Sequence, residues 1–177
     1  SEKKGRERGK KVVFELKTLS KEAISRSLER VERYRLLNEP AVAESICHDI
    51  LHVEPEHQQA LVMLVLVTTD QFAENPAIGI NQALDLIPRL HSEYERAYYT
   101  GIIYERQGKA RLVRDYPGAG FDAYDLFHEA MDWFEKAEVI HPAANEDTVL
   151  RWNNCARLIM ANRLKPRSRD ETEQGIE

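Results

Sequence analysis

Residues 101–109 read Gly-Ile-Ile-Tyr-Glu-Arg-Gln-Gly-Lys, and they are the strongest indication of the fold. They lie inside an expected helix that begins near Glu93, because Ser92 followed by Glu95 has the spacing of a capping box. The helix reaches at least Gln107. Residues 115–121 then read Asp-Tyr-Pro-Gly-Ala-Gly-Phe, which is the most loop-like stretch in the body of the chain.

The rest of the chain follows the same pattern of helices separated by breakers. Glycine and proline are scarce between residues 12 and 165, and they fall between segments whose apolar residues recur at helical spacing. We therefore predict an all-α chain of about seven helices, over residues 21–38, 40–54, 57–72, 77–90, 93–107, 122–140 and 146–164. The centre of the third helix is apolar all round, so it must be covered on both sides or bind something. Residues 12–16 are apolar enough for a short strand or a helical lead-in, and the sequence leaves both open.

Residues 101–109 resemble the first helix and turn of a tetratricopeptide repeat (TPR). In that family a small residue, here Gly101, lets the paired helix approach closely, and an aromatic residue three positions later, here Tyr104, fills the gap. A glycine four positions further, here Gly108, supports the turn. Residues 135–142, Glu-Lys-Ala-Glu-Val-Ile-His-Pro, resemble the end of the family's second helix, and Val-Glu-Pro at 53–55 repeats that ending.

The repeat spacing is near the family period but irregular. Steps of 37, 36 and 52 residues separate the equivalent first-helix positions Ile24, Leu61, Ala97 and Val149, whereas the family period is 34. The long third step fits an insertion near residues 111–121. Leu28 and Val65 stand where the small residue belongs, and Thr68 replaces the aromatic residue. The resemblance implies a right-handed superhelix of antiparallel helix pairs, a TPR-like α-solenoid, over residues 20–164. The alternative is an unrelated antiparallel helical bundle built from the same amphipathic stripes.

Charge is distributed unevenly along the 177 residues. The net charge is -5, but residues 1–11 balance to +4 and residues 12–164 to about -8. We expect residues 1–19 to be a basic mobile segment and residues 165–177 a mobile tail.

An acidic body makes nucleic acid an unlikely main ligand. No apolar run is long enough to span a membrane, and two cysteines are too few for a disulfide framework, so we expect a cytoplasmic protein.

The resemblance implies a non-catalytic protein–protein interaction module or scaffold, because the first helices of successive pairs line a concave groove in that family. Its partner would be another protein or peptide, or a second copy of the chain. The groove is expected to be acidic at one end, apolar in the middle and Asn/Arg-containing at the other, without a clamp for a terminal carboxylate. The expected contacts are Val62, Leu66, Tyr98, Ile102, Leu150, Asn154 and Arg157.

Motifs for catalysis or for a cofactor are absent from the sequence, so we predict no catalytic residue, metal or cofactor. His48 and His52 are one helical turn apart and make a small all-α metal-binding protein or enzyme the alternative. A third interpretation is a structural subunit that forms a homodimer through its apolar patch.

Overall fold

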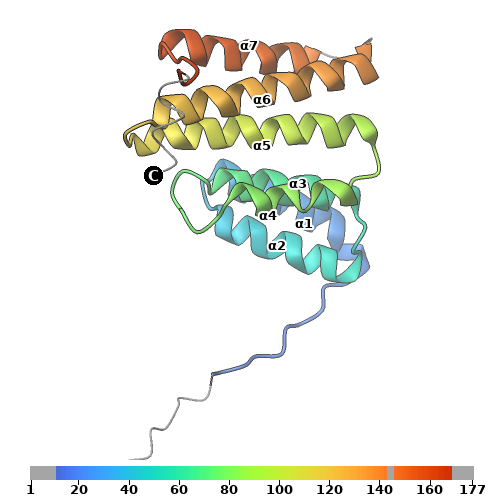
Figure 1. Cartoon of the computed structure of the whole chain (residues 1–177). Coiled ribbons are helices and arrows are strands. Elements are labelled where there is room, and N and C mark those ends of the chain that lie inside the picture. Colours follow the sequence, from blue (N-terminus) through green and yellow to red (C-terminus); the bar gives the residue numbers. More distant parts are fainter. Residues whose placement is uncertain (1–10, 143–145, 169–177) are drawn as a thin grey trace, which may run out of the picture.

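The structure is a computed structural model that describes residues 11–142 and 146–168, and every regular element in these ranges is helical. Figure 1 shows the helices lying side by side as a stack, with the N-terminal arm leaving at one end. In chain order the elements are the 3-10 turn Lys21–Ala23, α1 Ile24–Leu36, α2 Pro40–Val53, α3 Gln58–Asp70, α4 Ile80–Leu84, the 3-10 turn Ile87–Arg89, α5 Glu93–Arg114, α6 Ala119–Ile140 and α7 Glu146–Ala161.

The helices contact one another in a regular order. In sequence, α1, α3, α5 and α7 each touch the next one in that series, and we call these four the first layer. The second layer consists of α2, α4 and α6, each of which packs against the first-layer helix before it and the one after it. The chain therefore folds as successive helix hairpins that lie side by side.

The closest packing in this arrangement is between α5 and α6. A Cβ atom on Gly101 would lie 2.5 Å from the Phe134 ring, and one on Gly108 would lie 2.7 Å from the Phe127 ring. Both phenylalanines are completely buried. The absence of a side chain at each glycine leaves room for an aromatic ring of the antiparallel neighbour. The sequence predicted this close approach at Gly101, but it assigned the filling of the gap to Tyr104 and not to Phe134.

The residues around the expected insertion lengthen the two helices. α5 runs on to Arg114 and α6 begins at Ala119, so only residues 115–118 form the turn. Asp115 and Gly118 both adopt positive φ there, 46° and 85°. Gly108 consequently lies within α5 and does not support a turn. The sequence offers Asp122 as the N-cap of a helix over residues 122–140. The helix instead begins three residues earlier, so Asp122 lies in its first turn and accepts a hydrogen bond of 2.6 Å from the Tyr116 hydroxyl.

The fourth helix is much shorter than the sequence predicts. Of residues 77–90, only Ile80–Leu84 are α-helical, and a 3-10 turn follows at Ile87–Arg89. The extended backbone of Gly79 delays the start of the helix, and Pro88 cannot donate the hydrogen bond that would continue it. The second layer is therefore thin between α2 and α6.

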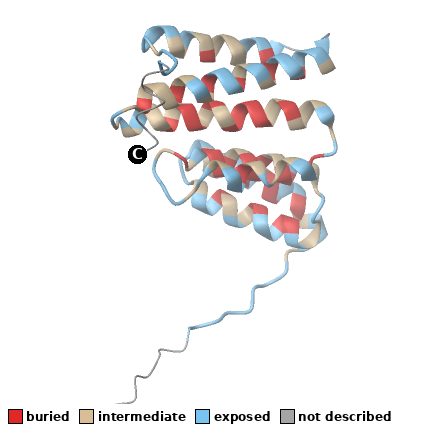
Figure 2. Ribbon diagram, viewed as in Figure 1, coloured by how far each residue is buried: buried red, intermediate tan, exposed pale blue. Residues whose placement is uncertain are grey.

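The cores of the hairpins merge across the first layer. Helix α3 contacts α1, α2, α4 and α5, and most of its residues are buried, so its apolar circumference is explained by packing on all sides. Figure 2 shows the buried residues concentrated where helices face one another. Half-buried Leu66 and Tyr99 each pack against more than one core cluster and so join the N-terminal and C-terminal halves.

The two ends of the described chain behave differently. Residues 11–20 form neither a strand nor a helix, and Val12, Val13, Phe14 and Leu16 are 75–84% exposed. At the other end Arg167 folds back onto α6, where it forms an ion pair of 2.9 Å with Asp122. Arg167, within the expected tail, thus contacts the body. Residues 1–10 and 169–177 lie outside the described part of the chain.

Substituting alanine for Gly101 tests the close contact between α5 and α6. The new methyl group must displace the buried Phe134 ring, and such overpacking costs about 1–3 kcal/mol of unfolding free energy, less up to about 1 kcal/mol gained from helix propensity. Gly79→Ala is the matched control, because a Cβ there meets nothing within 4 Å. Urea unfolding should show a lower midpoint for Gly101→Ala alone. Equal midpoints for the two variants would contradict the packing.

Candidate functional site

The first-layer surface, formed by α1, α3, α5 and α7, carries most of the residues that the sequence assigned to a groove. Val62, Leu66 and Tyr98 are half-buried, and Leu150 is 64% exposed. Asn154 and Arg157 lie on the same side of α7 as Leu150, at helical spacing. These six side chains, from three neighbouring helices, retain at least part of their surface.

Ile102 is an exception among the expected contact residues. It is only 1% exposed and belongs to the core cluster that contains Phe127 and Phe134, with Leu66, Tyr98 and Tyr99 packed against the same cluster. The expectation that Ile102 lines an open groove is therefore not met. The helical spacing placed it on the correct side of α5 but did not show that neighbouring side chains cover it.

Asp70, at the end of α3, connects three first-layer helices. It accepts a hydrogen bond of 2.7 Å from Arg35 Nε on α1 and pairs with Arg106 NH1 on α5. Arg106 also donates to Thr69 Oγ1 at 3.0 Å and to the Leu66 carbonyl at 3.3 Å. Burial lowers the pKa of Arg106 and outweighs the opposing effect of Asp70, but such a guanidinium stays charged at neutral pH.

Glu105 makes the corresponding connection between α5 and α7. Its carboxylate is completely buried, and Oε1 accepts a hydrogen bond of 2.6 Å from Asn154 Nδ2. Lys109 Nζ lies 3.5 Å from Oε1, and Arg151 NH1 lies 3.7 Å from Oε2. Burial lowers the pKa of Arg151, but its hydrogen bond to Tyr98 and the nearby Glu105 carboxylate outweigh burial, so the pKa is raised.

These two networks meet at Arg106, which lies close to both Asp70 and Glu105, and we call them together the cationic strip. Its members are Arg35, Asp70, Glu105, Arg106, Lys109 and Arg151. Among these six side chains, cations outnumber carboxylates by four to two. The sequence placed one cation, Arg157, on this surface. It missed the others because Arg35 on α1, Arg106 and Lys109 on α5 and Arg151 on α7 come together only through the packing of separate helices.

An aromatic cluster lies beside the strip at the start of α5. Tyr98 stacks on Tyr94 with ring centroids 5.7 Å apart and meets Tyr99 edge to face at 5.1 Å. Tyr98 also contacts the buried Phe134 ring at 5.8 Å. Burial raises the pKa of Tyr99 to about 12, so this hydroxyl is neutral at physiological pH. The tyrosines that cluster in the sequence are thus chiefly packing residues.

A hollow with mainly apolar walls lies on a different side of α5. A cavity of about 780 Å³, which we call the outer groove, opens between the 3-10 turn at Ile87, the first half of α5 and the second half of α6. Ala97, Trp133, Val139 and Ile140 provide its apolar walls. The groove occupies the position in the second layer that a longer α4 would have covered. The sequence predicts a full-length fourth helix, which would leave no groove at this position.

The histidines and cysteines do not assemble into a metal site in the part of the chain that the structure describes, where no group of three potential ligands comes together. His48 is exposed and lies 3.5 Å from Glu44, one turn away, while His57 accepts a hydrogen bond from the Ala60 amide at the start of α3. Cys47 and Cys155 are free thiols in the core.

Within residues 11–142 and 146–168, none of the helices combines the length and the apolar character that a membrane span requires.

Comparison with known proteins identified no matching family model, no similar curated protein and no similar solved structure.

Replacing Asn154 with alanine tests the connection between α5 and α7. The change removes the only hydrogen-bond donor to the buried Glu105 carboxylate in the described chain, which costs about 1–3 kcal/mol of unfolding free energy. Asn153→Ala is the control, because Asn153 makes no hydrogen bond among the described residues and should change stability by less than about 0.5 kcal/mol. Denaturant unfolding compares them. A loss for Asn153→Ala as large as that for Asn154→Ala would refute the assignment.

The buried thiols predict a pH dependence of labelling and of stability. Burial raises the pKa of Cys47 and of Cys155 to about 12, so both should react with a thiol reagent at pH 8 only as fast as the chain unfolds. Because the unfolded thiols ionise near their usual pKa of about 8.5 and the folded ones do not, stability should fall as the pH rises from about 9 toward 12. Rapid labelling of both thiols in the absence of denaturant would contradict this burial.

Proposed function

We propose that this protein is a non-catalytic protein–protein interaction module whose helix hairpins form a TPR-like right-handed superhelix. The order of helix contacts supports the proposal, because each first-layer helix touches the next and each second-layer helix packs between two of them. The Gly101–Phe134 contact supports it too, since the small residue allows the close approach of the paired helix that the resemblance implied. The free, buried thiols are consistent with a cytoplasmic location.

The observation that carries this proposal is the cationic strip beside exposed apolar side chains on one surface. Leu150 is largely exposed one turn from Asn154, and half-buried Leu66 and Tyr98 border the arginine networks. A surface of this kind recognises a segment that offers both apolar side chains and carboxylates. The partner is therefore an extended or helical segment of another protein, with acidic residues next to leucine-like ones.

The strip is also prearranged for binding. Asp70 and Glu105 hold the arginines across three helix boundaries, so their side chains lose little freedom when a partner arrives. The internal carboxylates leave a surplus of positive charge for the partner. In contrast to the expected groove, the apolar contribution comes from Val62, Leu66, Tyr98 and Leu150, because Ile102 is covered.

Selection of displayed random peptides on the whole chain tests this function directly. We expect enriched sequences that combine apolar and acidic residues, with binding that weakens as salt rises because screening reduces the attraction. A Leu150→Glu substitution should weaken the best peptide about tenfold or more, since a leucine side chain contributes roughly 1.5–3 kcal/mol when buried. Fluorescence anisotropy of the labelled peptide gives the Kd.

Val139→Glu provides the matched control. It introduces the same carboxylate at another exposed apolar residue, but on α6 beside the outer groove. Peptide affinity should be unchanged in this variant, and helical circular dichroism should be unchanged in both. If no peptide is enriched, or if Val139→Glu weakens the peptide as much as Leu150→Glu does, the first-layer surface is not the binding surface.

A further inference from the structure

The outer groove is an apolar surface from which a covering element is missing. α4 spans only Ile80–Leu84, whereas its second-layer neighbours α2 and α6 span Pro40–Val53 and Ala119–Ile140. The walls that a longer helix would cover remain open, and Val139 in one of them is 80% exposed. An open cavity of about 780 Å³ with such walls is large enough to take several side chains of a docked segment.

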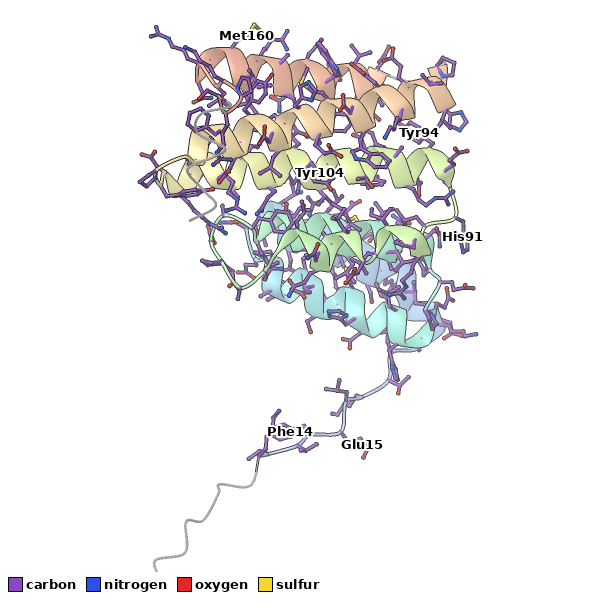
Figure 3. All side chains as sticks on the ribbon, viewed as in Figure 1. Phe14, Glu15, His91, Tyr94, Tyr104 and Met160 are labelled. Atoms are coloured by element: carbon purple, nitrogen blue, oxygen red, sulfur yellow. The ribbon has the colours of Figure 1, made fainter. Side chains whose placement is uncertain are left out.

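The arm at the other end of the molecule has the complementary property. Val12, Val13, Phe14 and Leu16 are each at least 75% exposed, and residues 11–18 lie outside any helix. Four large apolar side chains within five residues are an unusual feature of a free surface, because contiguous exposed apolar residues favour association. In Figure 3, Phe14 lies on the arm well away from the helices.

We propose that residues 12–16 of one copy occupy the outer groove of a second copy. This interaction uses a surface other than the proposed peptide-binding one, because the groove is lined from α5 by Glu93, Arg96, Ala97 and Thr100. Tyr98, Glu105, Arg106 and Lys109, which belong to the first-layer surface, follow a different side of the same helix.

The charges of the arm and of the outer groove favour the arm as the segment that occupies the groove. Lys10, Lys11 and Lys17 flank the apolar residues of the arm, with Glu15 as the only acidic residue among positions 10–17. The groove carries three carboxylates, on Glu93, Asp132 and Glu135. It is also lined by two cations, Arg96 and Lys136, so the groove carries a formal charge of -1 against +2 for residues 10–17. The rim therefore attracts a basic segment whose apolar side chains fill the centre.

The position of the arm favours a second copy over the same molecule. Leu19 packs against the core of the first hairpin, and the five residues from there to Phe14 reach at most about 17 Å. In Figure 1 the helices α3 and α4 lie between the origin of the arm and the α5–α6 hairpin, and the arm points away from it. Reciprocal exchange of two arms across a two-fold axis would make both contacts at once and close the assembly as a dimer.

Sedimentation velocity of the full chain at increasing concentration tests the exchange. We expect a monomer–dimer equilibrium that Phe14→Glu and Val139→Glu each abolish, because either change places a carboxylate in the contact. Val113→Glu is the control, since Val113 is as exposed as the arm residues but does not line the groove. It should dimerise like the wild type. A wild-type chain that is monomeric at every concentration would overturn the proposal, as would a dimer that survives Phe14→Glu.

Mixing the two defective variants distinguishes exchange between copies from any other dimer. Phe14→Glu keeps an intact groove and Val139→Glu keeps an intact arm, so together they can form one of the two contacts. A heterodimer that appears only in the mixture supports the exchange. Two variants that remain monomeric when mixed would overturn it, provided that the wild type dimerises.

Trp133 in the groove wall supplies a second measurement. A synthetic peptide of residues 10–19 added to Phe14→Glu protein that also carries Trp152→Phe should change the emission of Trp133, the remaining tryptophan. Absence of any saturable change would contradict binding in the groove. Leu150→Glu should leave both the dimer and this signal intact, so failure of the exchange and failure of the peptide-binding function are separate results.

Discussion

The packing of α5 against α6 depends on two glycines that each accept a phenylalanine ring. Gly101 faces Phe134 and Gly108 faces Phe127, with the same seven-residue separation on both helices. This equal spacing fixes the antiparallel register, because sliding one helix along the other would force the rings against side chains that fill the space. The two long helices therefore behave as one hairpin, and the positions of Glu105, of the tyrosines and of the outer groove follow from it.

The same hairpin determines which polar residues meet. Glu105 lies between the two glycines, and its fully buried carboxylate can be accommodated only because α7 brings Asn154 and Arg151 to it. These contacts link α7 to α5, although replacing such a network by apolar residues need not reduce stability. Asp70 performs the same task between α1, α3 and α5. The arginines are thus held by internal carboxylates, and the surface keeps its positive character although the chain as a whole is acidic.

Much of the fold could be predicted from local sequence, and the failures have a common cause. Ser92 accepts a hydrogen bond from the Glu95 amide, Pro40 opens α2, and the helix before Glu54-Pro55 ends as expected. These are interactions within a few residues. The length of α4 could not be predicted, because its apolar residues at helical spacing pack equally well from a 3-10 turn and irregular segments. Burial of Ile102 involves Leu66 of α3 and Phe134 of α6, which no local pattern relates to it.

The two surfaces differ in a way that makes separate roles physically reasonable. The cationic strip is preorganised by carboxylates that belong to neighbouring helices, so it depends on the whole stack being assembled and favours a partner with negative charge. The outer groove depends only on the α5–α6 hairpin and on the shortness of α4, and its rim favours a positive segment. An acidic partner segment suited to the strip is repelled by Glu93, Asp132 and Glu135, while the basic arm is repelled by the arginines of the strip. If both proposed interactions occur, opposite charge on two faces of α5 disfavours binding of either segment at the other surface.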